Sequence, residues 1–234
     1  MELHHQPDYS VNEIEYLILG QTLIDILVYL IVIVLQFSQI VLLSRVLAGQ
    51  HSFTDEIATN HDRMQVSEII QRLAQIATAM CFLVWIYRAH RNLPALSAHN
   101  LTYSPGWAVG GFFIPVLNLV HPYLVIKEIW KASSSEADIS DGVSWQDTKT
   151  SPLLGVWWSA WVVANILGQT VLWLSSSEKN VSAFINITWL AITSYVIGII
   201  AAALILFLVR EIDARQKEKI SHLMGLSLAP ENLK

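Results

Sequence analysis

The sequence predicts an all-α fold, a polytopic transmembrane helical bundle with about five spans. Hydrophobic residues make up 53% of the 234 residues and charged residues only 14%, a balance that is unusual for a soluble domain. Uncharged runs occupy residues 26–43, 153–174 and 181–209. Each matches or exceeds the roughly 18 apolar residues typical of a transmembrane helix. A fourth uncharged region, 93–126, contains the interrupted stretch GGFFIPVLNLVHP.

The charges divide the chain into three parts. Residues 1–22 form an N-terminal acidic segment without Lys or Arg, and the hydrophobic run behind it is too long for a signal peptide. The first helix, expected from about Leu23 to Leu47, should therefore remain in the mature protein. The helical bundle occupies residues 23–209, and a charged C-terminal tail, 210–234, continues the last helix as a solvated segment.

The second and fourth spans have recognisable starts. The apolar run 73–87 covers about 22 Å, less than the roughly 30 Å hydrocarbon core, so the arginines at its ends should extend toward the headgroups. The polar triplet at 54–56 is expected to cap a separate short interfacial helix. Ser151 and Pro152 place a cap and a first-turn proline at the start of the fourth span, after a polar loop over 133–151.

The third hydrophobic region either spans the membrane or folds back. Trp107 and Trp130 are separated by about 36 Å of helix, enough to reach both interfacial belts, which favours a span broken by proline. Five spans place the N-terminus outside and the C-terminus inside, with eleven Lys and Arg residues inside and three outside. The alternative is four spans plus a re-entrant segment, with both termini inside and ten basic residues against four.

Polar residues and prolines in this region form the candidate intramembrane site. On a helix, Gly111, Pro115, Asn118 and Pro122 would lie in one stripe, and the prolines would free backbone carbonyls that need partners. One interpretation is a kinked helix in which Asn118 donates an interhelical hydrogen bond worth about 0.6–2 kcal/mol. The other is a polar site for an ion or small ligand. The candidate residues are Pro115, Asn118, His121, Pro122 and Asn165.

No pattern of catalytic or ligating residues is present. The histidines are scattered without metal-ligand spacing, and His90 and His121 are expected at different depths, which disfavours haem. The single cysteine, Cys81, excludes an internal disulfide. The sequence therefore predicts no enzyme activity, no catalytic, metal or cofactor-binding residues, and no nucleic-acid partner.

Several motifs between residues 85 and 130 resemble a known family. The segments are WIYRA followed by NL, SPGWAV, FIP with NL and PY, and EIW. In this order they are similar to the bacterial multi-pass membrane family catalogued as domain of unknown function 4328, over about residues 73–174. The matching motif residues include Trp85, Tyr87, Arg88, Asn92, Pro105, Trp107 and Glu128. The resemblance implies a location in the bacterial cytoplasmic membrane and no particular activity.

Two functions are compatible with these observations. The first is a non-enzymatic membrane protein that acts through contacts with lipids, with partner membrane proteins or with further copies of itself. The second is a small transporter or channel component that uses the candidate intramembrane site.

Overall fold

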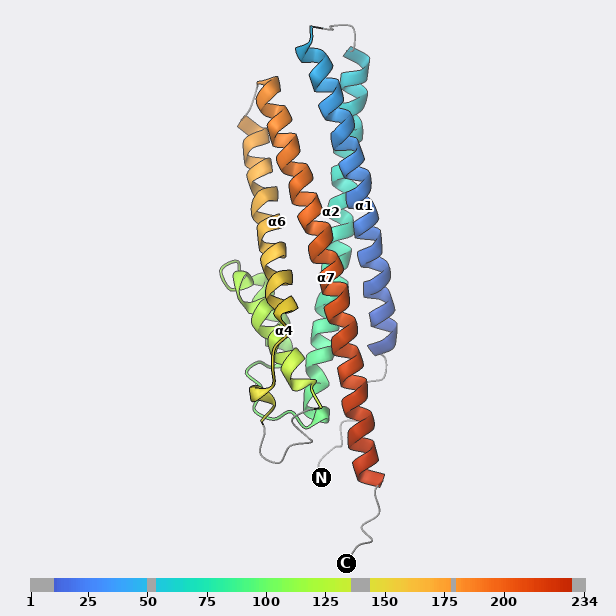
Figure 1. Ribbon diagram of the computed structural model, residues 1–234, viewed down its shortest axis with the longest axis vertical. Coiled ribbons are helices and arrows are strands. Elements are labelled where there is room, and N and C mark those ends of the chain that lie inside the picture. Colours follow the sequence, from blue (N-terminus) through green and yellow to red (C-terminus); the bar gives the residue numbers. More distant parts are fainter. Residues whose placement is uncertain (1–10, 50–53, 136–143, 178–179, 229–234) are drawn as a thin grey trace, which may run out of the picture. The chain divides into compact units, whose positions relative to one another are not determined.

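All regular structure in the described part of the chain is helical, which confirms the all-α prediction (Figure 1). The computed structural model describes residues 11–49, 54–135, 144–177 and 180–228. The long helices are α1 (Val11–Leu47), α2 (Thr54–Arg91), α6 (Pro152–Ser177) and α7 (Val181–Leu228). The shorter elements between α2 and α6 are η1 (Leu93–Leu96), α3 (Pro105–Gly110), η2 (Gly111–Phe113), η3 (Leu117–Leu119), α4 (His121–Ala132) and η4 (Trp145–Asp147).

Two helix starts differ from the prediction and one agrees with it. Helix α1 begins at Val11 and not near Leu23, so the second half of the acidic segment is helical, whereas residues 1–10 lie outside the described residues. Helix α2 is continuous from Thr54, because residues 54–91 contain no Gly or Pro that would separate an interfacial helix from the span. Helix α6 begins at Pro152 as predicted, and the Ser151 hydroxyl oxygen accepts from Leu153 N at 3.3 Å.

Three of the long helices are long and apolar enough to cross a membrane. The candidate spans are Tyr16–Leu47 of α1, Asp62–Arg91 of α2 and Val181–Gly225 of α7. Helix α6 has no charged residue over its 26 residues, but four tryptophans, Asn165 and Gln169 make it less apolar. The chain is thus a membrane protein by the length and composition of its helices, and the three candidate spans among the described residues do not confirm five crossings.

The third hydrophobic region does not form the helix expected between Trp107 and Trp130. It is divided into α3 with 6 residues, η2 and η3 with 3 each, and α4 with 12. Even α4 covers only about 18 Å. Pro115 lies between η2 and η3, and Pro122 lies in the first turn of α4, where a missing backbone donor is tolerated. The predicted stripe of Gly111, Pro115, Asn118 and Pro122 therefore does not exist as a helix face.

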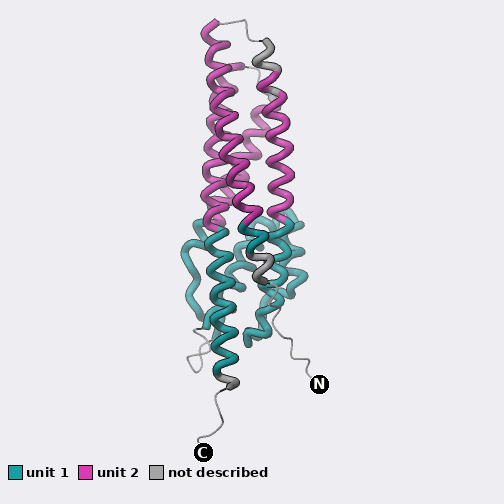
Figure 2. The backbone as a smooth tube through the Cα atoms, turned by 90° about the vertical axis from the view of Figure 1, so that its right-hand side faces the viewer, with its two compact units in different colours: residues 1–19, 80–156, 205–234 teal, residues 20–79, 157–204 magenta. Residues whose placement is uncertain are grey.

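The chain divides into two compact units (Figure 2). Unit 1 contains residues 1–19, 80–156 and 205–234, and so includes every short element from η1 to η4. Unit 2 contains residues 20–79 and 157–204, and its described helices are parts of α1, α2, α6 and α7. Among the candidate intramembrane residues, Asn165 belongs to unit 2 and the other four to unit 1.

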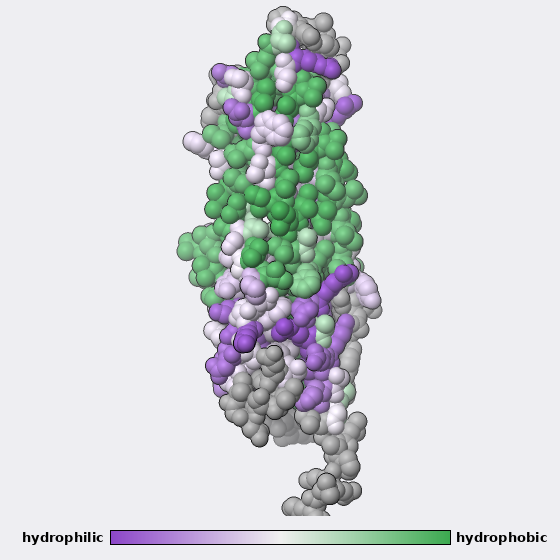
Figure 3. Space-filling model, viewed as in Figure 1, coloured by the Kyte–Doolittle hydropathy of each residue, from purple (hydrophilic) through white to green (hydrophobic). Residues whose placement is uncertain are grey.

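Apolar side chains are exposed along the long helices. Only 11% of the most apolar stretch of α1 is buried inside the protein, and the same fraction holds for α2. Hydrophobic residues cover long uninterrupted parts of the surface drawn in Figure 3. Continuous apolar surface of this extent is typical of helices that face lipid.

Candidate functional site

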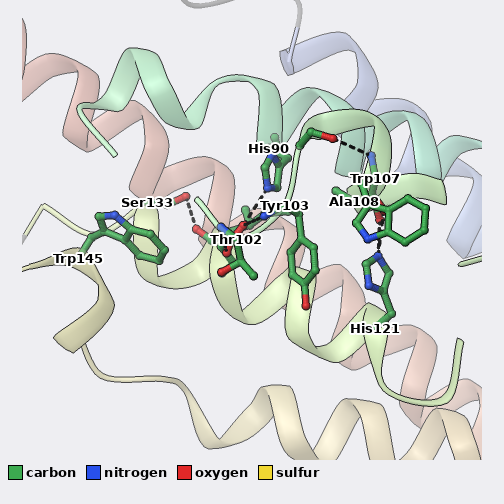
Figure 4. Close-up of polar contacts among 12 residues, drawn as sticks. His90, Thr102, Tyr103, Trp107, Ala108, His121, Ser133 and Trp145 are labelled. Atoms are coloured by element: carbon green, nitrogen blue, oxygen red, sulfur yellow. Dashed lines mark hydrogen bonds and ion pairs between the residues drawn. The ribbon is translucent and has the colours of Figure 1, made fainter. Parts of the chain in front are cut away.

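The site in unit 1 is organised around a buried glutamate. Glu128 on α4 is 6% exposed, and its carboxylate accepts hydrogen bonds from the backbone nitrogens of Thr102 at 2.8 Å and Tyr103 at 3.4 Å. The Nε2 atom of His90, near the end of α2, lies 2.9 Å from Glu128 Oε1 (Figure 4). One side chain therefore connects α2, the segment before α3, and α4.

The surroundings of Glu128 favour its ionised form. Burial raises the pKa of this carboxyl, but the hydrogen bonds from His90 and Thr102 lower it by more, so that the net pKa lies below its ordinary value. His90 is fully buried, and its Nδ1 atom has no hydrogen-bond partner among the described residues, so Nε2 makes its polar contact. The pair links two helices through a buried hydrogen bond to a carboxylate.

His121 closes the third hydrophobic region into a hairpin. It is the first residue of α4, and its Nε2 lies 3.1 Å from the carbonyl oxygen of Trp107 and 3.2 Å from that of Ala108 (Figure 4). A continuous helix would separate residues 108 and 121 by about 20 Å. The ring of Tyr103 packs edge-on against His121 at 4.9 Å between centroids, so the segment before α3 contacts both His121 and Glu128.

Gly111 provides the space for this histidine. A Cβ atom added to Gly111 would lie 2.3 Å from His121 Cδ2 and 2.4 Å from Nε2. Gly111 has φ −63° and ψ −20°, an ordinary helical conformation. It is therefore the close approach of the ring, and not an unusual backbone angle, that requires glycine at this position.

The residues at the turn, 112–120, form what we call the hairpin tip, and they are largely apolar and exposed. Phe113 is 73% exposed, Val116 78% and Leu119 57%. Much of the backbone of the tip is bonded within the tip itself: Asn118 N donates to Ile114 O at 2.8 Å and Val120 N to Leu117 O at 2.9 Å. Pro115 has no backbone donor. The tip therefore combines apolar side chains with backbone donors that need little from water.

Residues 213–219 of α7 include a buried polar face that the sequence analysis did not predict. Asp213, Gln216 and Lys219 are at most 3% exposed, although this segment was expected to be solvated. Trp85 Nε1 donates to Asp213 Oδ1 at 3.1 Å, and Gln216 Nε2 donates to the carbonyl oxygen of Ala89 at 3.0 Å. The spacing of three residues, together with the buried apolar Leu208, Val209 and Ile212, was the available signal that one face is buried.

Gln216 and Lys219 also connect α7 to α4. Gln216 Nε2 lies 3.1 Å from the hydroxyl oxygen of Ser133, just after α4, and Lys219 Nζ donates to the carbonyl oxygen of Ala132 at 3.3 Å. On the neighbouring face of α7, the Arg215 guanidinium lies 3.9 Å above the ring of Trp130. The end of α7 is thus fixed to both α2 and α4.

The other predicted residues have more modest positions. Pro115 and Asn118 lie in the hairpin tip, and Pro122 is buried beside His121. Asn165 is exposed on α6 and donates to the carbonyl oxygen of Trp161 in its own helix at 2.8 Å. Among the remaining motif residues, Asn92 is buried and Arg88 is partly exposed. Tyr87 is 40% exposed and Trp107 is 49% exposed. Pro105 is the first residue of α3.

The polar contacts described above join helices and loops of unit 1 to one another. Within residues 11–49, 54–135, 144–177 and 180–228, no group of three or more His, Cys, Asp or Glu side chains could hold a metal ion. The described polar side chains of unit 1 mainly satisfy backbone carbonyls and amides. They hold the hairpin and the end of α7 in place.

Comparisons with known proteins are consistent with the sequence motifs. No curated protein and no solved structure matches the chain. The family model described as Domain of unknown function (DUF4328) matches residues 51–214, which is wider than the range 73–174 indicated by the motifs. The match covers well over half of the chain and includes Trp85, His90, Glu128 and Asp213. The chain therefore belongs to the family described as Domain of unknown function (DUF4328).

Proposed function

We propose that this chain is a non-enzymatic, multi-pass membrane protein that acts through direct contact between its hairpin tip and lipid. The single observation that carries this proposal is the exposed apolar tip on a polar, firmly bonded base. In this proposal α1, α2, α6 and α7 cross the cell membrane, and the hairpin is re-entrant.

The energetics favour lipid over water around the tip. Transfer of a large apolar side chain out of water is worth roughly 1.5–3 kcal/mol, and Phe113, Val116 and Leu119 are each more than half exposed. Irregular backbone is tolerated at membrane depth only where its polar groups are satisfied, and several donors of the tip are bonded internally. Both requirements for insertion into a leaflet are thus largely met by the tip itself.

The position of the tip within unit 1 also supports insertion. The ring of Phe112 packs edge-on against that of Phe82, with the centroids 6.3 Å apart. Phe82 belongs to the candidate membrane span Asp62–Arg91. The apolar surface of the tip therefore continues from a helix that is itself expected to face lipid.

The predicted solute site of Pro115, Asn118, His121 and Asn165 has less support as one unit. The Nε2 atom of His121 already contacts two carbonyl oxygens, and the amide of Asn165 donates within its own helix. Lipid contact uses the hairpin as it is folded, without releasing either of these interactions.

Single-cysteine fluorescence tests the proposal. In a Cys81→Ala background, Val116→Cys and Leu119→Cys are labelled with an environment-sensitive fluorophore in nanodiscs. His99→Cys is the control, because His99 is exposed in a polar segment of the same unit. We expect blue-shifted emission at 116 and 119, with quenching by lipids that carry bromine or nitroxide on their acyl chains, and neither effect at 99.

The opposite pattern would count against insertion. If a membrane-impermeant maleimide modifies positions 116 and 119 as fast as position 99, and acyl-chain quenchers leave them unaffected, then the tip faces water or protein. Quenching at 99 as strongly as at 116 would also contradict the proposal, because the base would then lie as deep as the tip.

A further inference from the structure

Unit 2 contains a partly open cavity of about 810 Å³, in which polar side chains interrupt a mainly apolar lining. A volume of this size is within the range of roughly 300–1,000 Å³ that is typical of small-molecule sites. All four long helices contribute to its walls, and three of them are the candidate membrane spans. The cavity therefore lies among segments that are expected to be surrounded by hydrocarbon.

The walls are unusually rich in carboxamide side chains. Eight of them line the cavity, and they come from α1, α2 and α6: Gln36, Gln39, Asn60, Gln65, Gln71, Gln75, Asn165 and Gln169. Several are oriented by phenol groups. Gln75 Nε2 lies 3.0 Å from the Tyr29 hydroxyl oxygen, and the Tyr195 hydroxyl is hydrogen-bonded with the side chains of Gln36 and Gln71.

Polar side chains at this location need an occupant. Hydrocarbon supplies no hydrogen bonds, and an unsatisfied polar group there costs several kcal/mol. A carboxamide offers two donors and one acceptor oxygen, more than the contacts described above use. Either water or a polar ligand must satisfy the remaining capacity, and the volume exceeds that of a few water molecules.

We infer that this cavity binds a small neutral solute rich in hydroxyl groups. Carboxamide and phenol groups both donate and accept hydrogen bonds, as hydroxyl groups do. Each hydroxyl group of such a solute can therefore either donate to these side chains or accept from them. The charged side chains of the lining are Glu68 and Arg72, one helical turn apart on α2 and opposite in sign. With no net charge in the walls, an ionic ligand would remain uncompensated at membrane depth.

Thiol accessibility tests the inference on the full chain in phosphatidylcholine nanodiscs. In the Cys81→Ala background, Ser194→Cys places a thiol in the cavity wall, whereas its neighbour Thr193→Cys places one on the exposed face of α7. The reagent is 2-hydroxyethyl methanethiosulfonate, which is small, neutral and polar, and intact mass gives the rate. We expect modification at 194 to be about tenfold faster than at 193, because a thiol in hydrocarbon ionises poorly.

Competition then defines the chemical class. We expect myo-inositol to slow modification at 194, and sodium gluconate, a polyol of similar size that carries a charge, to leave the rate unchanged. Adding Gln36→Leu should raise the half-protecting concentration of myo-inositol about tenfold while the thiol remains reactive. A second set of nanodiscs contains a neutral glucosyl diacylglycerol. Protection only in that set would assign the same neutral polyol chemistry to a lipid headgroup.

Three results would overturn the inference. Equal rates at 193 and 194 would show that the cavity is not an aqueous polar compartment. Protection by gluconate as strong as that by myo-inositol would exclude selection for neutral ligands. A fast reaction at 194 that neither the soluble polyol nor the glycolipid slows would leave the cavity as a water-filled space. None of these results depends on whether the hairpin tip enters the bilayer.

Discussion

Glu128 is the residue whose loss should loosen unit 1 most directly. Glu128→Gln removes the charge that holds His90, Thr102 and Tyr103 together. We expect a loss of about 1.5–3 kcal/mol in the free energy of unfolding, the usual contribution of a hydrogen bond to a charged group. Denaturant unfolding in detergent micelles measures it.

Glu211→Gln is the matched control for this substitution. Glu211 pairs with Arg215 one turn along α7 at 3.3 Å, and its side chain is 40% exposed. Such a surface pair contributes at most about 0.5 kcal/mol. If the two glutamine variants lose equal stability, the three contacts of Glu128 do not hold unit 1 together.

The same carboxylate should make stability fall in acid. The pKa of Glu128 in the folded protein is lowered from the ordinary value of 4.5. A lowered folded pKa means that the stabilisation is present above 4.5 and is lost as the pH falls through the folded value. The difference in the free energy of unfolding between the natural protein and Glu128→Gln should therefore become smaller as the pH falls from about 5 to about 2. A difference that stays constant over this range would show that it does not come from the ionised carboxylate.

Gly111 should tolerate no side chain while His121 is present. Gly111→Ala would place Cβ within 2.4 Å of two ring atoms, so that the ring must leave the carbonyl oxygens of Trp107 and Ala108. We expect a loss of about 1–3 kcal/mol in unfolding free energy, the usual cost of overpacking. Gly106→Ala is the control, because no atom lies within 4 Å of its added Cβ.

A double-mutant cycle separates the clash from other effects of the added methyl group. In a His121→Ala background the cost of Gly111→Ala should largely disappear, which gives a coupling free energy of about 1 kcal/mol or more. Additive losses would show that the ring and the glycine are not in direct conflict. Thermal unfolding in the same detergent measures all four proteins.

At the scale of elements, the sequence predicted where the chain is interrupted but not how. The prolines at 115 and 122, with Gly111 between Trp107 and His121, marked the third hydrophobic region as broken. The fold-back depends on His121 contacting carbonyl oxygens 13 and 14 residues earlier. A helical periodicity analysis cannot find such a contact, because it joins residues that a helix would keep far apart.

The end of α7 shows the same difference between local and long-range information. Continuation of the helix beyond residue 209 was predicted from its composition, and α7 does continue to Leu228. The charges of both signs indicated a solvated helix, yet Asp213 and Lys219 are each 1% exposed. The spacing of three residues places them on one face of α7, but the partners that bury this face, Trp85 and Ala132, lie on other helices.

Gln216 should therefore be more important for α7 than its charged neighbours. Gln216→Ala removes a donor shared between Ala89 O and Ser133 Oγ, both buried, and we expect a loss of about 1–3 kcal/mol. Hydrogen exchange of the amides in residues 213–225 should accelerate. Lys217→Ala, at an exposed position, is the control. It should change the free energy of unfolding by no more than about 0.5 kcal/mol and leave the exchange rates of these amides unchanged.

A finding of equal exchange rates in the two variants would contradict this role. The end of α7 would then be held by its apolar contacts at Leu208, Val209 and Ile212, without a contribution from the polar face. The free energy of unfolding alone would not distinguish these cases, so the segment-resolved exchange measurement is needed.

At the scale of the whole molecule, composition was sufficient for the class of protein and insufficient for the number of crossings. The long uncharged runs predicted membrane helices, and three such helices are present in α1, α2 and α7. Charge asymmetry hardly separated five spans from four, because eleven and ten of the basic residues lie inside in the two arrangements. The cavity of unit 2 was not predicted, since its walls come from four helices and Asn165 is the one residue of the candidate intramembrane site among them.

The orientation of the termini tests the arrangement with four crossing helices. Cysteines are introduced at 2, 48 and 234 in the Cys81→Ala background and treated with a membrane-impermeant maleimide in right-side-out vesicles. Four crossings and the positive-inside rule predict labelling at 48, which follows α1, and protection at both ends until the membrane is permeabilised. Five crossings predict labelling at 2 and protection at 48. The C-terminus is inside and protected in both arrangements, so positions 2 and 48 decide between them. The number of crossings is even if position 2 is protected together with the C-terminus, and odd if position 2 is labelled.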